Sequence, residues 1–331
     1  MPSVLVVIVN WRTAEMALAA AEAALIAMKG IDGAITIVDN DSGDGSEATL
    51  REGVMKRGWD RVRVIQSGRN GGYGAGNNVG IRAGLPEGGK PDYVYVLNPD
   101  AFPAPDAIRA LVEHMERHPE TGIAGSFVHG PDGVPHASAF RFFSLGSEFE
   151  DAAKTGPISR LLASAIVPLP TPSETTRVDW VSGASMMLRQ SVLDRIGLFD
   201  EAYFLYFEET DLCLRAARAG YATDHVRPAQ VTHIGSVSTG MKTLARVPAY
   251  WFDSRWRYFA KNHGRAYAIA ATAARTAGGL LLGLRRLVGR CAQQNPPHFL
   301  RDLLAHGLRT GCRAVAPERG TATTAPAGSK T

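Results

Sequence analysis

Residues 92–100 read Asp-Tyr-Val-Tyr-Val-Leu-Asn-Pro-Asp, and this stretch decides the fold. Its first six residues are mostly aromatic and β-branched, which is typical of a buried strand. Pro99 lacks the backbone N–H that a central strand needs, so the strand ends there and Asp100 lies at its carboxyl tip. Ligands of open α/β sheets bind beyond the carboxyl ends of the strands, where a carboxylate can hold a divalent cation against phosphates. A plain turn is the alternative, because Asn-Pro-Asp also suits a strand-to-turn exit.

Strand and helix patterns alternate along the first 128 residues. The near-continuous apolar run at residues 4–9 is typical of a parallel strand buried on both faces. Further strands are expected at residues 34–38, 62–66 and 122–128, and helices at residues 14–28, 46–57 and 106–118, with another running from the glycine-rich loop 68–76 to Ala83. This alternation predicts right-handed crossovers and a mostly parallel sheet flanked by helices, which is an α/β fold.

The second half of the chain is less regular. Residues 129–176 contain scattered Gly and Pro, and we expect loops and a variable helix over the site. A strand with a glycine turn is expected at residues 178–188, helices at residues 190–196 and 209–219, and a late strand at residues 221–226. From Pro248 the chain is expected to be helical, with breaks at Gly264, Gly278-Gly279 and Pro296-Pro297.

Composition describes an ordinary globular chain. The 331 residues are 45% hydrophobic and 21% charged, enough for one large or two modest domains. Cys213, Cys291 and Cys312 are widely spaced, which argues against a disulfide framework and for a reducing compartment. The most apolar window, residues 266–284, is interrupted by Arg275, so no clear transmembrane helix is expected.

The charge is distributed unevenly. Residues 255–313 contain eleven Lys/Arg and one acidic residue, whereas residues 1–254 contain 23 Lys/Arg and 30 Asp/Glu. A basic tail on an acidic body indicates a polyanionic partner, either a membrane surface or a nucleic acid. Aromatic and basic side chains interleave in residues 251–261, which fits nucleic-acid binding, an interfacial membrane helix, or a docking helix with a solvated basic face.

An acidic cluster follows an aromatic run. Glu208, Glu209 and Asp211 lie within four residues, directly after Phe-Leu-Tyr-Phe at residues 204–207. Carboxylates this close repel unless a cation or a proton relieves them, and aromatic walls raise the pKa of a carboxyl. One of them can therefore act as a general base near neutral pH. Favourable placement of negative charge at a helix start is the structural alternative.

Three other polar segments are candidates. His233 follows a short strand and could ligate a metal if Asp100 lies nearby, although a lone His is usually structural. Asp-Asn-Asp-Ser at residues 39–42 either caps a turn or accepts hydrogen bonds from a nucleobase or ribose. The glycine-rich loop at residues 69–78 lets a backbone approach a phosphate, but it matches neither the dinucleotide nor the P-loop pattern.

Together these motifs resemble the family 2 glycosyltransferases, which are inverting GT-A enzymes that use nucleotide-sugar donors. The similarity runs in order from Val4 to Gly264 and is closest to the bacterial rhamnosyltransferase-like branch, with Asn-Pro-Asp in place of Asp-x-Asp. Five segments carry it: Val-Val-Ile-Val-Asn-Trp at 6–11, Ile-Val-Asp-Asn-Asp-Ser at 37–42, Asn-Gly-Gly-Tyr-Gly-Ala-Gly-Asn at 70–77, Leu-Asn-Pro-Asp at 97–100, and Phe-Leu-Tyr-Phe-Glu-Glu-Thr-Asp-Leu-Cys-Leu-Arg at 204–215.

The resemblance implies an architecture. It implies a GT-A fold with a Rossmann-like, mostly parallel sheet over residues 1–245, divided into a nucleotide-sugar half at 1–128 and an acceptor and catalytic half at 129–245. Residues 246–315 would be a basic, helical, membrane-associated C-terminal region, and residues 316–331 a disordered tail.

The resemblance also assigns roles to single residues. Asp100 and His233, with Asn98, would hold Mg²⁺ or Mn²⁺ against the diphosphate. Glu209 would be the general base, with Glu208 as the alternative. The remaining residues implied by the resemblance are Asp211 at the catalytic centre, Asn10, Asp39, Asp41, Asn70, Gly72 and Asn98 on the donor side, and Trp180 and Gly183 on the acceptor side.

The implied reaction is a single displacement that inverts the anomeric carbon. The donor would be dTDP-rhamnose or a UDP-sugar, and the acceptor a glycan or a lipid-linked sugar of the cell envelope. The protein would be cytoplasmic, peripheral on the inner membrane face, with no nucleic-acid partner. A nucleotidyltransferase or sugar-nucleotide pyrophosphorylase is the enzymatic alternative, but Asn-Trp-Arg-Thr at residues 10–13 replaces its expected signature. A non-enzymatic polyanion-binding protein would leave the carboxylate clusters unexplained.

Overall fold

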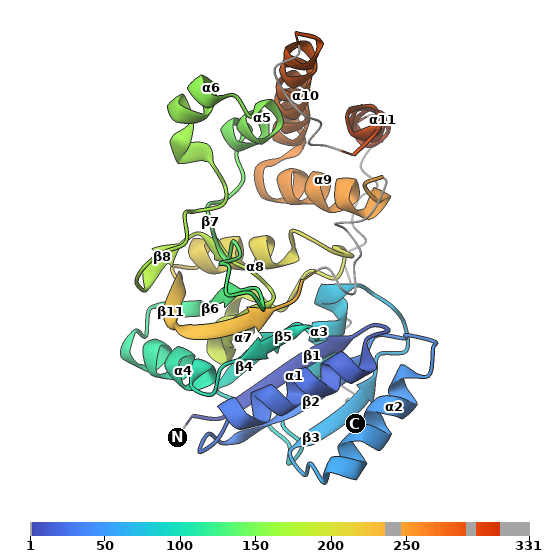
Figure 1. The fold of residues 1–331 in the computed structure, drawn as a ribbon, viewed down its shortest axis with the longest axis vertical. Coiled ribbons are helices and arrows are strands. Elements are labelled where there is room, and N and C mark those ends of the chain that lie inside the picture. The colour runs from blue at the N-terminus through green and yellow to red at the C-terminus, as the bar shows by residue number, and fades with distance from the viewer. Residues whose placement is uncertain (1, 236–245, 289–295, 312–331) are drawn as a thin grey trace, which may run out of the picture.

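The computed structural model describes residues 2–235, 246–288 and 296–311 (Figure 1). Within these ranges the main sheet has nine strands in the order β3-β2-β1-β4-β10-β6-β11-β5, with β8 pairing β11. The strands are β1 Val4–Asn10, β2 Gly33–Asp39, β3 Val62–Gln66, β4 Tyr93–Leu97, β5 Ala101–Pro103, β6 Thr121–His129, β8 Thr176–Val178, β10 Ser185–Arg189 and β11 Ala222–His233.

The first half of the sheet is parallel, as predicted. Strand β1 pairs in parallel with β2 and β4, and β2 pairs in parallel with β3. Strand β10 is antiparallel to both β4 and β6, which gives the otherwise mostly parallel sheet a mixed centre. Because β1 and β4 point the same way, their carboxyl ends meet at one edge of the sheet, where Asn10 and Asn98 lie.

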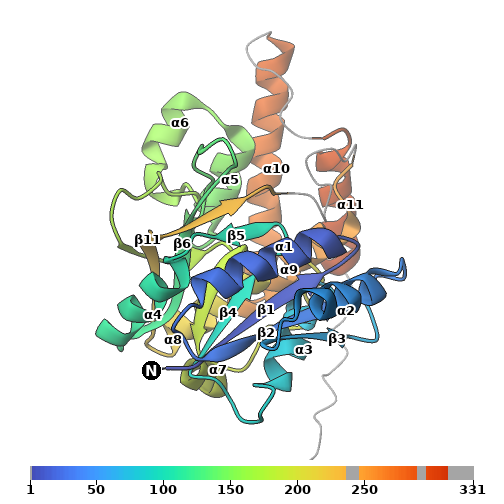
Figure 2. The same cartoon turned by 60° about the horizontal axis from the view of Figure 1, so that its bottom comes forward.

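Helices cover both faces of the sheet. Alternate residues of β1 show the division, since Val4, Val6 and Ile8 pack with α1, α2 and α4, whereas Leu5 and Val7 pack with α3, α7 and α8. Figure 2 shows α1 lying over the β1–β4 part of the sheet. The bounds are α1 Ala14–Ala27, α2 Ser46–Arg57, α3 Tyr73–Ala83, α4 Ala107–Arg117, α7 Gln190–Ile196 and α8 Glu208–Arg218.

A second group of helices stands above the sheet in Figure 1. It joins α9 Ala249–His263, α10 Arg265–Leu287 and α11 Phe299–Gly311 to α5 Leu145–Ala153, α6 Gly156–Leu161 and a short 3-10 turn at Ala163–Ala165. The expected helix in residues 129–176 therefore exists as α5, but it packs against α10 rather than over the site. The same stretch contains β7 Ala139–Phe140, which pairs with β9 Trp180–Val181 in a small second sheet.

The helical breaks predicted after Pro248 are partly wrong. Gly264, with φ +90°, separates α9 from α10 as expected, and α11 begins after Pro296-Pro297. In contrast, α10 runs straight through Gly278-Gly279. A Cβ on Gly278 would lie 2.5 Å from the Phe149 carbonyl oxygen, and one on Gly279 would lie 3.0 Å from the Leu300 side chain. These glycines therefore permit close helix packing.

The helices that follow the expected boundary at residue 245 pack against helices that precede it. Helix α9 packs against α8, and α10 packs against α5, so the C-terminal helices contact two helices of the expected acceptor and catalytic half at residues 129–245. The buried Glu148 of α5, for example, pairs with Arg255 of α9. The expected disordered tail at residues 316–331 lies outside the described residues.

Candidate active site

A cavity of about 460 Å³ lies at the carboxyl ends of β1 and β4. Eight of the residues expected at the site line it: Asn70, Gly72, Asn98, Asp100, Gly183, Glu208, Glu209 and His233. Five expected residues are not among its lining residues: Asn10, Asp39, Asp41, Trp180 and Asp211. Sequence reasoning did not assign roles to Val9, Trp11, Asn40, Tyr73, Pro99, Ser182, Ala184, Phe204, Leu205, Tyr206 and Tyr250, which complete the lining.

Asp100 and His233 meet at one wall of this cavity. Strand β11 runs antiparallel to β5 and places His233 opposite Ala101, so His233 Nε2 lies 3.1 Å from Asp100 Oδ1. Asn98 Nδ2 is 3.4 Å from the same nitrogen. Burial raises the pKa of Asp100, but the hydrogen bond and charge of His233 and nearby backbone N–H groups outweigh it and lower the net pKa.

The donor atoms of this wall fit a hard divalent cation. A carboxylate oxygen and an imidazole nitrogen converge there, and such ligands suit Mg²⁺ and Mn²⁺. Within the described ranges no three His, Cys, Asp or Glu side chains come together as a complete metal cage. Mg²⁺ sites of this incomplete kind are typical where substrate phosphates and water complete the coordination.

Glu208 and Glu209 begin α8 at the opposite wall. The two residues before them, Tyr206 and Phe207, have φ values of +71° and +70°, which cost a non-glycine residue about 1–2 kcal/mol each. Packing holds this bend, since Phe207 lies against Phe143, with ring centroids 4.9 Å apart. The bend turns the chain into the helix so that both glutamates sit in its first turn.

Burial perturbs the protonation of both glutamates. Desolvation raises the pKa of Glu208 well above its usual value, and the neighbouring Glu209 carboxylate raises it further. Desolvation raises the pKa of Glu209 to about 7. Each carboxyl has a buried oxygen, Oε2, with no hydrogen-bond partner among the described residues. Glu208 is 2% exposed and Glu209 is half-buried, so the pair retains a proton near neutral pH, with Glu209 better placed to meet a ligand.

The glycine-rich loop makes close contacts with two segments that are distant in sequence. Gly72 has φ +87°, and a Cβ there would lie 1.8 Å from the Phe204 carbonyl oxygen. The next residue, Tyr73, donates its N–H to the same oxygen at 3.0 Å and its hydroxyl to the Gly183 carbonyl at 2.5 Å. The loop thus fastens α3 to the aromatic segment before α8 and to the turn at Gly183. Tyr73 belongs to the motif at residues 70–77, but its partners Phe204 and Gly183 are more than a hundred residues away in the sequence.

Asp39 and Asn10 order the strand tips behind the cavity. Asp39 Oδ1 accepts hydrogen bonds from Asn10 Nδ2 at 2.8 Å and Ser42 Oγ at 2.5 Å, and Asp39 is buried. Asp41 is exposed, with φ +55°. The neighbouring Asn40 lines the cavity instead, and its Oδ1 is buried without a partner in the described part of the chain.

Trp180 is buried and is not among the lining residues of the cavity. Its ring stacks on Phe140 at a centroid distance of 4.0 Å, and its Nε1 donates to the Arg141 carbonyl at 2.8 Å. Five aromatic side chains line the cavity, namely Trp11, Tyr73, Phe204, Tyr206 and Tyr250, and the Tyr250 ring centroid lies 5.3 Å from that of Phe204 and 6.4 Å from that of Tyr206. The aromatic run at residues 204–207 could indicate Phe204 and Tyr206 from the sequence, but Tyr250 comes from α9.

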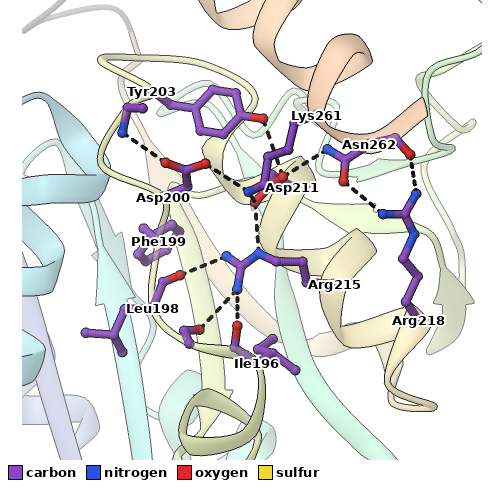
Figure 3. A network of polar contacts seen from close by, with 12 residues as sticks. Ile196, Leu198, Phe199, Asp200, Tyr203, Asp211, Arg215, Arg218, Lys261 and Asn262 are labelled. Atoms are coloured by element: carbon purple, nitrogen blue, oxygen red, sulfur yellow. Dashed lines mark hydrogen bonds and ion pairs between the residues drawn. The ribbon is translucent and has the colours of Figure 1, made fainter. Parts of the chain in front are cut away.

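Asp211 lies in a polar network beside the cavity (Figure 3). Its fully buried carboxylate accepts hydrogen bonds from Lys261 Nζ at 2.8 Å, Asn262 Nδ2 at 2.9 Å and Arg215 Nε at 2.9 Å. Burial raises the pKa of Asp211, but these three hydrogen bonds outweigh it and lower the net pKa. A carboxylate with so many partners is a poor proton acceptor, so the geometry makes Asp211 a positioning residue that ties α8 to α9.

Comparisons with known proteins agree with this geometry. The profile of the family described as "Glycosyl transferase family 2" matches residues 3–168, and that of "Glycosyl transferase family group 2" matches residues 93–316. The N-acetylglucosaminyl-diphospho-decaprenol L-rhamnosyltransferase of Mycobacterium tuberculosis is 31% identical over 239 residues, which are 69% of this chain and 75% of that protein. The rhamnosyltransferase WbbL of Escherichia coli is 28% identical over 58% of this chain and 71% of its own.

The fold has counterparts among solved structures. The mannosyltransferase PcManGT from Pyrobaculum calidifontis, in complex with GDP-Man and Mn²⁺, has a TM-score of 0.52 and 16% identity, covering 93% of this chain and 80% of that one. The chain belongs to glycosyl transferase family 2, in its rhamnosyltransferase-like branch, and it is a glycosyltransferase with a GT-A fold. The pyrophosphorylase and polyanion-binding alternatives are not favoured.

Proposed function

We propose that this enzyme transfers a sugar, L-rhamnose from dTDP-rhamnose first and a UDP-sugar next, to a hydroxyl of a lipid-linked or glycan acceptor of the cell envelope. The names of the Mycobacterium tuberculosis and Escherichia coli relatives support the rhamnosyl donor, and the first of them supports a lipid-linked acceptor. The observation that carries the proposal is the cavity itself, with a half-buried glutamate of raised pKa on one wall and an Asp-His pair on the other.

The Asp-His wall is the donor side. Asp100 and His233, with the Asn98 amide, would hold Mg²⁺ or Mn²⁺ together with the donor diphosphate. The presence of Mn²⁺ with GDP-Man in the Pyrobaculum calidifontis structure supports a divalent cation. When bound, the cation neutralises charge on the leaving diphosphate. Asn40, Asn70 and Gly72 line the same cavity and would contact the nucleotide sugar, while Asn10, Asp39 and Asp41 would support the nucleoside side from the strand tips.

Glu209 is the proposed general base. Its carboxylate takes the proton of the acceptor hydroxyl as that oxygen attacks the anomeric carbon from the face opposite the diphosphate, which inverts the centre in one displacement. Glu208, which is more deeply buried and has the more strongly raised pKa, would keep its proton and favour the ionised form of its neighbour. Asp211 would hold α8 in register without touching substrate.

The aromatic side of the cavity is the proposed acceptor site. Phe204, Tyr206 and Tyr250 line the cavity together with Glu209, and aromatic rings can pack against the apolar side of a sugar ring. Gly183 lies at the same wall, where Tyr73 leaves no room for a Cβ, which would fall 3.0 Å from its hydroxyl. We propose a cytoplasmic location, peripheral on the inner face of the plasma membrane, where a lipid-linked acceptor is accessible.

A donor-panel assay with two variants tests the function. With Mn²⁺ present, dTDP-rhamnose and UDP-sugars are compared as donors, using a lipid-linked acceptor and a free glycan. Glu209→Gln should lower kcat by roughly 10²–10⁴-fold because the proton acceptor is lost, with donor binding intact. Asp100→Ala should weaken Mn²⁺-dependent nucleotide binding, measured by calorimetry. Full transfer activity in Glu209→Gln would show that Glu209 is not the base, and its loss in Glu208→Gln alone would move the role to Glu208.

A further inference from the structure

Helix α10 exposes a face made entirely of apolar residues. Ile269, Leu280, Leu284 and Leu287 are 52%, 57%, 62% and 85% exposed, and Ala266, Ala273 and Ala277 lie exposed between them. Steps of three and four residues place all seven on one side of the helix. We call this set the α10 face. It runs the length of a 23-residue helix, which spans about 34 Å at the usual rise per residue.

Such a face is unusual for a helix in water. Surface helices normally carry polar residues on the side away from the core, and large contiguous apolar patches mark interaction sites. The neighbouring α11 extends the apolar surface, because Leu304 and Leu308 are exposed one turn apart. Some apolar partner must therefore cover the α10 face.

The opposite side of α10 is anchored in the protein. Arg275, which is 9% exposed, donates to Glu148 at 3.3 Å and to Asp151 at 2.7 Å, both on α5. Among the described helices, α10 is the one long and apolar enough by composition to cross a membrane. A crossing orientation would draw these two carboxylates of α5 into the hydrocarbon, which is costly. An orientation in the membrane plane leaves them within the protein.

The charges near the α10 face indicate which kind of partner covers it. Helix α10 contains four arginines and no acidic residue. Arg285 and Arg309 donate to backbone carbonyls, so no carboxylate neutralises them in these contacts. A second copy would bring two such basic regions together without the acidic flanking residues that stabilise helix pairs. An anionic lipid surface complements Arg285 and Arg309, because its head groups carry negative charge.

We propose that α10 lies in the plane of an anionic bilayer surface, with the leucines of the α10 face among the acyl chains and Arg285 and Arg309 at the head groups. Interfacial helices bind in this way, with an apolar side and Lys or Arg beside it. The proposal explains how the enzyme reaches a lipid-linked acceptor, and only this explanation rests on the proposed function. Lipid binding and sugar transfer are measured separately.

Vesicle flotation of the full chain tests the proposal. The wild type should float with phosphatidylcholine vesicles that contain phosphatidylglycerol, and much less with phosphatidylcholine alone. Leu280→Glu combined with Leu284→Glu should reduce flotation by at least about tenfold, since both substitutions place a charge where the proposal places a leucine among the acyl chains. The control is Met55→Glu on α2, where an apolar side chain that is more exposed than either leucine (75%) lies outside the helical group.

The outcomes separate the alternatives. Donor hydrolysis by the double variant should equal that of the wild type, so a loss of flotation is distinguishable from a failure of the catalytic proposal. Flotation of the double variant at the wild-type level would overturn the proposal. So would a wild-type dimer, seen by light scattering, that the double variant dissociates. Retention of the wild type on vesicles after an alkaline carbonate wash would show a helix that crosses the membrane instead.

Discussion

Glu208 and Glu209 are neighbours in the chain, but the fold gives their carboxyl groups different surroundings. Glu208 points into the interior beside Gly74 of α3, whereas Glu209 retains access to the cavity. Both have a raised pKa because burial disfavours the ionised form. Two adjacent carboxyls in this state share protons, and the more buried one holds its proton more tightly.

This difference predicts the pH dependence of transfer. A base is active when ionised, so kcat/KM should fall as the pH drops through about 7, the pKa of Glu209. Glu208→Gln should leave that acidic limb in place, because the amide resembles the neutral carboxyl that Glu208 already presents. The measurement is a pH–rate profile of both proteins. A displacement of the limb by about one pH unit or more in Glu208→Gln would mean that Glu208 is ionised during turnover.

At the level of elements, a buried ion cluster joins α5, α9 and α10. Glu148 Oε2 accepts hydrogen bonds from Arg255 Nη2 at 2.6 Å and Nε at 2.9 Å, and from Arg275 Nη1 at 3.3 Å. Glu148 and Arg255 are almost completely buried. One carboxylate of α5 thus binds arginines of α9 and α10, which lie more than a hundred residues later in the chain.

Glu148→Gln should therefore destabilise the protein strongly. It leaves the buried Arg255 guanidinium without its carboxylate and removes one of the two carboxylates that pair with Arg275, a loss of about 3–5 kcal/mol in the free energy of unfolding. Urea unfolding followed by circular dichroism measures it. Glu22→Gln on the exposed side of α1 is the control and should change stability by less than about 0.5 kcal/mol. Equal stability of the two variants would show that the helices hold together by apolar packing alone.

Elements could be predicted where the pattern is local. The strands at the start of the chain follow from apolar runs, and their ends follow from Asn10 and Pro99. The prediction failed at Gly278-Gly279, where helix breaking is the usual local preference, because α5 and α11 approach too closely for a side chain. The helix that carries Glu148 was expected, but its partner α10 lies more than a hundred residues away.

At the level of the whole molecule, the ionised carboxylate of Glu209, the proposed base, lowers the free energy of unfolding. Glu209 has a folded pKa of about 7 against 4.5 when free, so folding binds the proton more tightly. Stability from this group is therefore complete below pH 4.5 and is lost as the pH rises towards 7. Glu209→Gln removes the ionisation and should raise the free energy of unfolding at pH 8 by on the order of 1–3 kcal/mol.

Thermal unfolding of the metal-free protein at two pH values tests this expectation. The melting temperature of Glu209→Gln should exceed that of the wild type at pH 8, and the difference should shrink towards pH 4.5. A variant that melts below the wild type at pH 8 would contradict the argument, since it would mean that the ionised carboxylate is stabilised in the fold.

The sequence by itself determined the α/β class, the strand ends that carry Asp100 and Asn98, and the family, because each depends on residues that are close in the chain. Tertiary structure decided which of those residues face the cavity. Asp211 lies only two residues after Glu209, yet Lys261 and Asn262 of α9 donate hydrogen bonds to its carboxylate, while Glu209 Oε2 is buried without a hydrogen-bond partner among the described residues. Trp180 stacks on Phe140 and is not among the lining residues of the cavity, whereas Tyr250 of α9 lines it. The local pattern specifies an element. The residues that cover its side chains come from elsewhere in the chain, so only tertiary packing determines which side chains face the cavity.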